Sequence, residues 1–442
     1  MLAATMLPAQ QDFARSLILR ADRVVADSSA PFVARLSRSN TAPYKPTTGL
    51  RVRLFLVRGD QAREIASAPL PPRDLVDEPL ALTAGVNGVE DGEWRLRAEI
   101  VDGTATLATL DEAVQLVKGI DVQQSAVERR LAKIQGHEGA KASILYPFQL
   151  AGAVNARKRR LTQADFGIPW DPEQPPYDFP AGIRASMELL RSLEAGNDSL
   201  WRAKGDHERH YWFAEASEPM AYRVYAPLKW NGKNPLPMVL VLHGNTRDQD
   251  YYFERDGGIL AELAEQHGYL VATPMGYRPN AGWGSLSLRT PVGGRAGFVP
   301  DPSRLRQSEL SEMDAIHVLD LVTKEYGIDP ARVYLFGHSA GGAGTWYLGQ
   351  KYADRWAAIA ASAAATRPDG FPFERLKGLP VMVCHGDQDD EVPVTSSRNM
   401  VKAMKEHGNE PVYLEVPGAT HGTVVALVEP KVFDFFDQHP HR

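Results

Sequence analysis

The sequence predicts an α/β fold with a mostly parallel, doubly wound sheet, preceded by a small all-β domain and a helical bridge. Three patterns lead to this prediction. Apolar and polar residues alternate with period two over residues 16–118, helical spacing dominates residues 119–205, and apolar runs alternate with amphipathic segments over residues 206–442. Period-two alternation is typical of half-buried strands, whereas apolar runs separated by helices are typical of parallel strands buried on both faces.

The first region has the patterning of a β-sandwich. Runs such as Leu50–Val57 and Trp94–Val101 alternate, and the dipeptides Gly59-Asp60 and Asn87-Gly88 are turn signals between strands. The length of the region suits an immunoglobulin-like domain. Residues 1–11 include small and apolar residues but no basic start, so we expect at most the remnant of a signal peptide over residues 1–15, which slightly favours a periplasmic or secreted location over a cytoplasmic one.

The last region predicts buried strands joined by helices. The candidate strands are Met238–Leu242, Tyr269–Thr273, Val333–Phe336, Pro380–Val383 and Val412–Val416. A helix is expected from near Ser308 to Tyr326, because apolar residues recur there every three or four positions, and Gly327 ends it. A further helix is expected over Ser396–His407.

Composition excludes several classes of protein and site. The 442 residues are 43% hydrophobic and 24% charged, which is typical of a globular chain. Cys384 is the only cysteine, so neither an intramolecular disulfide nor a cysteine-based metal site can form, and we predict no metal. The net charge of −6 provides no global positive field for nucleic acid or an anionic membrane, and no apolar run approaches membrane-spanning length.

The motif Gly337-His338-Ser339-Ala340-Gly341 lies between a predicted buried strand and a predicted helix. A serine on such a sharp turn exposes its hydroxyl, and the glycines two residues before and after it allow the backbone to bend and the helix to pack closely. The sequence therefore predicts Ser339 as a nucleophile.

A serine nucleophile needs a histidine base and a carboxylate that orients it. Asp389 follows the strand that ends at Cys384, and His421 follows the next predicted strand. Both residues come after the serine, in the order that this kind of sheet requires. We therefore predict Ser339, His421 and Asp389 as nucleophile, base and orienting acid.

Two backbone amides should hold the oxyanion of the tetrahedral intermediate. The loop Leu242-His243-Gly244-Asn245 ends an early buried strand, so we assign this role to the amides of Asn245 and Ala340. For His243 a role in holding its loop is favoured over that of a base, because it precedes the nucleophile.

These motifs resemble the serine esterases of the α/β-hydrolase superfamily. More narrowly, they resemble the bacterial feruloyl-esterase and polyhydroxybutyrate-depolymerase-like branch, close to the prolyl-oligopeptidase-like hydrolases. The resemblance rests on Leu242-His243-Gly244, Gly337 to Gly342, the spacing H-G-x-x-D-x-x-V-P from His385 to Pro393, and Gly418 to His421. It covers about Met220 to Phe436. It implies an α/β-hydrolase fold and a carboxylic ester hydrolase that acts through an acyl-enzyme without a cofactor. It also selects Asp389 over Asp387 and Asp390.

A long loop, Tyr277–Gln307, is expected at the active-site edge of the sheet, where loops commonly carry specificity. Together with His243 and His338, its Tyr277 and Trp283 are candidate substrate contacts. Its arginines, at 278, 289, 295, 304 and 306, suggest an anionic substrate, although pairing with distant acids is the more ordinary explanation for any single one.

Three functions remain open on the sequence. The first is a serine carboxylesterase acting on a small-molecule or polymeric ester, with aromatic feruloyl-type, polyester and carbohydrate esters as candidates. The second is a serine peptidase of prolyl-oligopeptidase-like type on the same scaffold. The third is a binding protein whose hydrolase half has lost its activity.

Overall fold

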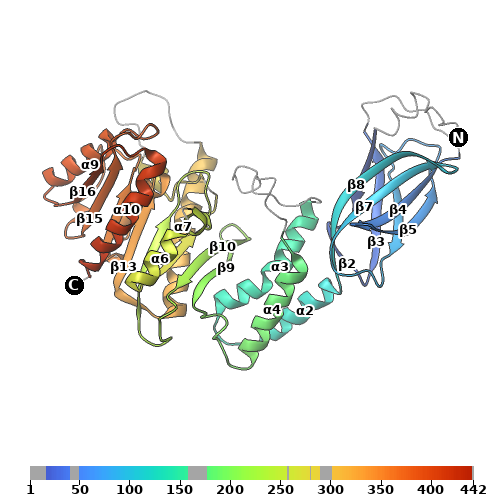
Figure 1. The fold of residues 1–442 in the computed structure, drawn as a ribbon, viewed down its shortest axis with the longest axis horizontal. Helices are drawn as coiled ribbons and strands as arrows, with labels where there is room; N and C mark the ends of the chain where they lie inside the picture. The colour runs from blue at the N-terminus through green and yellow to red at the C-terminus, as the bar shows by residue number, and fades with distance from the viewer. Residues whose placement is uncertain are drawn as a thin grey trace. The chain divides into compact units, whose positions relative to one another are not determined.

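The structure is a computed structural model that describes residues 16–39, 49–157, 177–255, 258–278, 280–288 and 301–440 (Figure 1). The described residues form two compact units. The first contains residues up to 135 together with 144–157 and 177–194, and the second contains 136–143 and residues from 195 onward. The expected signal remnant, residues 1–15, lies outside the described residues. The domain boundaries predicted at residues 118 and 205 remain predictions.

The first unit begins with two β-sheets. The three-stranded sheet has the order β1-β3-β6 and the five-stranded sheet has the order β2-β8-β7-β4-β5. The strands are β1 (Leu17–Ala21), β2 (Val25–Asp27), β3 (Pro31–Arg38), β4 (Arg51–Arg58), β5 (Gln61–Pro69), β6 (Leu80–Gly85), β7 (Gly92–Asp102) and β8 (Ala105–Val117).

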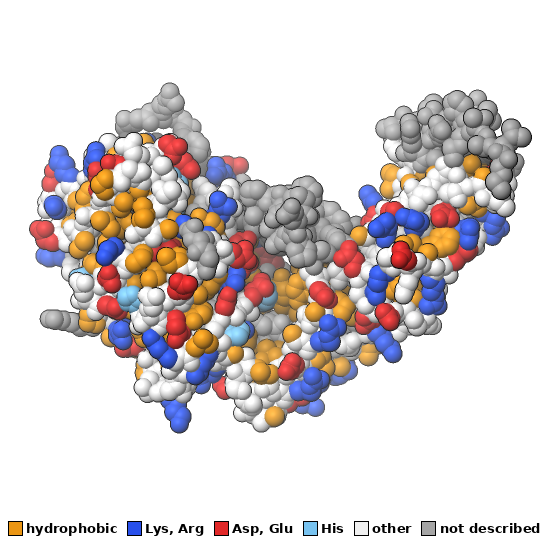
Figure 2. Space-filling view, in the orientation of Figure 1, with side chains coloured by type: hydrophobic (Ala, Val, Ile, Leu, Met, Phe, Trp, Pro, Cys, Tyr) orange, Lys and Arg blue, Asp and Glu red, His pale blue; other side chains and the backbone are white. Residues whose placement is uncertain are grey.

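Alternating side chains from the two sheets share one core. Val52 and Leu54 of β4 are fully buried and belong to the same hydrophobic cluster as Ala34 and Leu36 of β3, on the other sheet. Two sheets that bury one face each against the other form a sandwich. The predicted all-β region is therefore confirmed, and its immunoglobulin-like assignment remains a prediction. Figure 2 shows acidic and basic side chains interspersed over the visible face of this unit.

Polar side chains attach the helices of the bridge to this sandwich. The helices are α2 (Ile120–Leu131), α3 (Glu138–Arg157) and α4 (Phe179–Glu194). Asn155 of α3 bonds both the amide and the carbonyl of Val25, at 2.9 and 2.8 Å. Gln115 of β8 bonds the Tyr177 carbonyl at 2.7 Å and the Phe179 amide at 3.2 Å, before and at the start of α4. These bonds satisfy backbone groups at the margin of the sheet.

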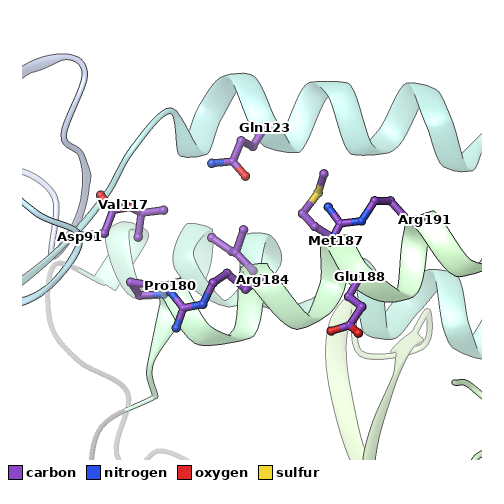
Figure 3. A pocket seen from close by; sticks show the side chains of 9 residues that line it. Asp91, Val117, Gln123, Pro180, Arg184, Met187, Glu188 and Arg191 are labelled. Atoms are coloured by element: carbon purple, nitrogen blue, oxygen red, sulfur yellow. The ribbon is translucent and has the colours of Figure 1, made fainter.

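A cavity of about 440 Å³ opens between α2, α4 and the end of β8 (Figure 3). Its charged lining includes Arg184, Glu188 and Arg191, which lie on one face of α4, and Gln123 of α2 lies opposite them. Among the described residues that line it there is no serine, cysteine or histidine.

The second unit is built on one eight-stranded sheet with the order β16-β15-β14-β13-β11-β12-β10-β9. Neighbouring strands from β16 to β12 are parallel, and β10 and β9 add antiparallel strands at one edge. The strands are β9 (Gly205–Phe213), β10 (Glu218–Ala226), β11 (Leu236–Leu242), β12 (Leu270–Pro274), β13 (Ile328–His338), β14 (Ala358–Ser362), β15 (Val381–Gly386) and β16 (Val412–Val416).

Helices cover both faces of this sheet (Figure 1). They are α5 (Tyr251–Glu254), α6 (Ile259–His267), α7 (Pro302–Tyr326), α8 (Ala340–Lys351), α9 (Thr395–Glu406) and α10 (His421–Asp437), with short 3₁₀ turns η3 (Ser285–Leu288), η4 (Ala353–Arg355) and η5 (Phe373–Leu376). Within the described part of the chain, no helix combines the length and apolar character needed to cross a bilayer.

Alternate residues of the central strands enter two separate cores. In β13, Leu335 packs in the cluster with α7, α8 and α9, whereas Tyr334 and Phe336 pack in the cluster with α6 and α10. Burial on both faces explains why these strands are continuous apolar runs in the sequence. The predicted α/β-hydrolase fold is confirmed.

The start of α7 differs from the prediction, and β13 is longer at both ends than the predicted Val333–Phe336. Helix α7 begins at Pro302 rather than near Ser308, because Asp301 caps it by accepting a hydrogen bond from the Ser303 amide and proline suits the first helical position. Arg304 and Arg306 therefore lie on a helix and not in the preceding loop.

Candidate active site

The turn between β13 and α8 holds Ser339 in an unusual backbone conformation, with φ 60° and ψ −119°. Neighbouring residues must be glycine for this turn to form. A Cβ atom on Gly341 would overlap the Leu242 carbonyl oxygen, and one on Gly337 would overlap the Gly341 carbonyl oxygen. The Ser339 amide donates to the Ser362 carbonyl oxygen at 2.9 Å, which anchors the turn to β14. The strained turn points to function, because such conformations persist where the surroundings enforce them.

Three side chains from different loops form a continuous hydrogen-bonded chain. The Nε2 atom of His421 lies 2.9 Å from the Ser339 hydroxyl, and its Nδ1 atom lies 2.8 Å from Oδ2 of Asp389. Ser339 follows β13, Asp389 follows β15, and His421 begins α10 after β16. Parallel strands end at the same edge of a sheet, so the topology brings these sequence-distant groups together.

Asp389 is held as a carboxylate in a protected environment. Its side chain is fully buried, and Oδ1 accepts hydrogen bonds from the amides of Glu391 at 3.0 Å and Val392 at 2.7 Å. Burial raises the pKa of Asp389, but the Val392 amide and His421 lower it, and the net effect holds the pKa below its ordinary value. Asp389 can therefore orient His421 and balance the charge of an imidazolium.

His338 packs beside His421 but is not part of the hydrogen-bonded series Ser339–His421–Asp389. Its ring centroid lies 4.7 Å from that of His421, and its Nδ1 atom lies 3.2 Å from the Ser362 hydroxyl. Burial first, and then the proximity of His421, lowers the pKa of His338 to about 3. His338 is therefore uncharged near neutral pH. Its ring packs against that of His421, next to Ser339.

The predicted oxyanion loop lies directly against the serine. A Cβ atom placed on Gly244 would stand 3.3 Å from Cβ and 3.8 Å from Oγ of Ser339. The next residue, Asn245, is exposed. Ala340 is the first residue of α8, where backbone amides have no acceptor within their own helix. Both predicted donor amides therefore belong to segments that adjoin Ser339.

His243 lies beneath this loop and is 1% exposed. Its Nε2 atom lies 2.9 Å from the Met275 carbonyl oxygen and its Nδ1 atom lies 2.8 Å from the Gly244 carbonyl oxygen. Burial lowers the pKa of His243. These contacts connect the loop after β11 to the loop after β12, which agrees with a role in holding the loop.

The two predicted aromatic contacts have different surroundings. Trp283 is 1% exposed, and its indole N–H donates to the His243 carbonyl oxygen at 3.1 Å, so it packs in the core beneath the site. Tyr277 is half-buried and has a positive φ of 60°. The Arg278 guanidinium lies 4.1 Å from the centre of the Tyr277 ring and pairs with Glu218 at 2.7 Å.

The arginines of the predicted specificity loop do not form one described cluster. Arg306 pairs with Glu309 on its own helix at 3.1 Å. Arg289 and Arg295 lie outside the described residues. The expected attraction of an anionic substrate remains a prediction.

Two residues that sequence reasoning did not assign also shape the site. Asp314 of α7 is fully buried, and its carboxylate accepts hydrogen bonds from the Tyr211 hydroxyl and from the amides of Gly276 and Tyr277. The sequence offered one signal for Asp314: this acid lies four residues after Leu310, on the apolar face of the predicted helix, where an acidic side chain is unexpected. The second is His385, whose Nε2 atom lies 3.1 Å from Oδ2 of Asp389.

Parts of the chain are similar to known proteins. Residues 303–437 match the family model described as Phospholipase/Carboxylesterase. A bifunctional acetylxylan esterase/xylanase of Neocallimastix patriciarum is 29% identical over 168 residues, which cover 38% of this chain and 21% of that relative. The match therefore spans about a fifth of the relative's length.

Solved structures of esterases are also similar. A CE1 ferulic acid esterase from Anaeromyces mucronatus aligns with a TM-score of 0.42 and 18% identity, over 53% of this chain and 90% of that one. A thermostable esterase aligns with a TM-score of 0.44 and 15% identity, over 97% of this chain and 100% of that one.

Proposed function

We propose that this member of the α/β-hydrolase superfamily is a serine carboxylic ester hydrolase that works through an acyl-enzyme. The observation that supports it most directly is the hydrogen-bonded chain from the Ser339 hydroxyl through His421 to Asp389, at 2.9 and 2.8 Å. A hydroxyl within this distance of an imidazole can lose its proton as it attacks.

In the acylation step, the Ser339 oxygen attacks the ester carbonyl carbon while His421 Nε2 takes the hydroxyl proton. The carbonyl electron pair moves onto oxygen, and the amides of Ala340 and Asn245 donate to that oxyanion. When the intermediate collapses, the bond to the alcohol oxygen breaks, and His421 returns its proton to the departing alcohol. Asp389 keeps the imidazole oriented and balances its transient positive charge.

Deacylation repeats these roles with water. His421 takes a proton from a water molecule, the resulting hydroxide attacks the acyl carbon, and the bond from this carbon to the Ser339 oxygen breaks. The proton on His421 then passes to the serine. The acid is released and the enzyme is regenerated, so the cycle needs no cofactor.

For the substrate, we include acetyl and hydroxycinnamoyl esters of carbohydrates in the proposal. The name of the relative from Neocallimastix patriciarum supports the acetyl esters. The resemblance of the motifs to feruloyl esterases supports the hydroxycinnamoyl esters. Polyesters remain a further candidate from the same resemblance.

The test is a graded substrate panel with a matched inactive variant. The panel contains p-nitrophenyl esters of increasing acyl length, methyl ferulate, acetylated xylan and peptide p-nitroanilides. The proposal predicts ester hydrolysis that Ser339→Ala abolishes and negligible anilide cleavage. Anilide turnover that matches ester turnover would instead favour a peptidase, and a folded parent that cleaves neither would refute both.

A further inference from the structure

The loop after β11 carries the proposed Asn245 donor, and the segment after β12 contacts this loop on both sides of that residue. Before it, Nε2 of His243 lies 2.9 Å from the Met275 carbonyl oxygen. After it, the amide of Thr246 donates to the side-chain oxygen of Asn280 at 2.8 Å. The two contacts therefore hold both ends of a short stretch that contains the proposed donor.

The direction of the Asn245 amide follows from the peptide plane that it shares with the Gly244 carbonyl group. This carbonyl oxygen lies 2.8 Å from Nδ1 of His243, on the buried side of the loop. The peptide is trans, so its C=O and the following N–H point in opposite directions. The Asn245 amide is therefore directed away from His243, in a loop whose Gly244 adjoins Ser339.

Thr246 needs support from a neighbour because its backbone lies in the left-handed region, with φ 63°. Residues that are branched at Cβ rarely adopt this conformation, since the side chain crowds the backbone there. The bond from Asn280 engages the amide of this same residue. Without that bond, we expect the backbone at Thr246 to relax toward a negative φ and to displace the adjoining Asn245 amide.

The segment that carries Asn280 is itself fixed to helix α7 at two points. Before the asparagine, Asp314 accepts the amides of Gly276 and Tyr277 at 2.6 and 3.1 Å. After it, the hydroxyl of Ser311 accepts the next bonded amide of the segment at 3.1 Å. Both side chains of α7 are almost fully buried. The exposed asparagine therefore extends from a segment with buried anchors, and this gives its bond a fixed starting point.

We propose that Asn280 is a positioning residue for the ester hydrolysis proposed above. Its side-chain oxygen holds Thr246 in the left-handed conformation, and this keeps the Asn245 amide in place beside Ser339. The oxyanion forms on every ester, so the contribution of Asn280 to the rate does not depend on the acyl group. This inference rests on the proposed function, because Asn280 acts only through the loop that stabilises the oxyanion.

The first test compares Asn280→Ala with the matched control Asn231→Ala. The side-chain oxygen of Asn231 also accepts backbone amides, those of Lys233 and Asn234 at 2.9 Å, but in an exposed turn before β11, at the other end of the strand. The substrates are p-nitrophenyl acetate and the longest p-nitrophenyl ester that the parent hydrolyses, and active sites are counted with a fluorophosphonate.

For Asn280→Ala we expect kcat per active site to fall about fivefold with both esters while KM stays unchanged, as the loss of one hydrogen bond implies. Asn231→Ala should keep the parent's kcat. An unchanged kcat in Asn280→Ala refutes the inference. A loss confined to one ester, or a rise in KM alone, also overturns it, because either result would show that Asn280 contacts the substrate directly.

A double-mutant cycle with Thr246→Gly tests the route of the effect. Glycine adopts the left-handed conformation without a steric cost, so the bond from Asn280 should matter less in that background. We expect Asn280→Ala to lower kcat by no more than about twofold when Thr246→Gly is already present. An equal loss in both backgrounds would show that Asn280 does not act through Thr246, and this would overturn the inference.

The outcomes separate this inference from the proposed function. An Asn280→Ala protein with fewer labelled sites but the parent's kcat would show a purely structural role and refute the inference. An active parent with unchanged variants overturns the inference alone. A folded parent that neither hydrolyses esters nor takes the fluorophosphonate label overturns the proposed function as well.

Discussion

The imidazole of His338 lies against that of His421, with ring centroids 4.7 Å apart, but only His421 reaches the Ser339 hydroxyl. Burial lowers the pKa of His338 to about 3, so this neighbour carries no charge near neutral pH. In the proposed mechanism, an uncharged neighbour lets His421 accept the serine proton without repulsion from a second imidazolium. The two adjacent histidines thus have different hydrogen-bond partners, Ser362 for His338 and Ser339 for His421.

The burial of His338 predicts a pH-dependent stability. The unfolded chain binds a proton near the ordinary pKa of 6.5, whereas the native protein resists it to about pH 3. Stability from this group is therefore present above pH 6.5 and is lost as the pH falls toward 3, by about 1.4 kcal/mol per pH unit. Between pH 7 and pH 5, the free energy of unfolding measured with urea should fall less in His338→Gln than in the parent. Equal losses would contradict the assignment.

The burial of Asp314 predicts a stability that changes with pH in the opposite direction. Burial raises the pKa of Asp314 to about 6, from an ordinary value of 3.8. Its contribution to stability is therefore present below pH 4 and is lost as the pH rises through 6. Asp314→Asn imitates the protonated acid, so its unfolding free energy relative to the parent should increase by about 2 kcal/mol between pH 4 and pH 7. A constant difference across this range would show that Asp314 does not titrate abnormally.

The proposed orienting role of Asp389 predicts a large and selective loss of kcat. Asp389→Asn keeps the shape of the side chain but removes the charge that fixes the His421 tautomer. We expect kcat to fall by about 10⁴-fold with the fold retained, by analogy with other serine hydrolases. Asp387→Asn is the matched control, because Asp387 instead accepts a bond from the Gly418 amide. A comparable loss of kcat in the control would contradict the assignment of Asp389.

The nucleophile turn predicts that Gly341 cannot be replaced. In Gly341→Ala the new methyl group overlaps the Leu242 carbonyl oxygen, so β11 and the turn must separate. We expect a destabilisation of about 1–3 kcal/mol together with loss of activity. Gly422→Ala is the control, since a Cβ atom there meets no atom within 4 Å although it lies beside His421. Thermal unfolding and ester turnover of the two variants decide the matter.

The sequence predicted most of the second unit because its local patterns and its topology agree. Continuous apolar runs identified β11, β12, β13, β15 and β16, and the loops that follow parallel strands meet at one edge, which led to Ser339, Asp389 and His421. The choice of Asp389 over Asp387 needed the family resemblance, since both acids follow the same strand. Their different hydrogen-bond partners depend on tertiary structure.

Other features could not be inferred from sequence for physical reasons. A tryptophan in a loop suggests an exposed stacking surface, but Trp283 is buried because its indole bonds the His243 carbonyl oxygen. His385 lies against Asp389 because the chain turns between these two residues, which are four positions apart. The periodicity of apolar residues does not predict the shape of such a turn. The dipeptide Asp301-Pro302 is a signal for the start of α7, because aspartate caps the helix and proline suits its first position. The prediction used the apolar residues alone and therefore placed the start of the helix too far along the chain.

The central claim is that Ser339 is the nucleophile of an ester hydrolase. The most direct measurement is the intact mass of the parent and of Ser339→Ala after fluorophosphonate treatment, combined with p-nitrophenyl acetate hydrolysis by untreated samples. We predict one adduct and ester turnover in the parent, and neither in the variant. An adduct on folded Ser339→Ala, or hydrolysis that survives the substitution, would contradict the claim.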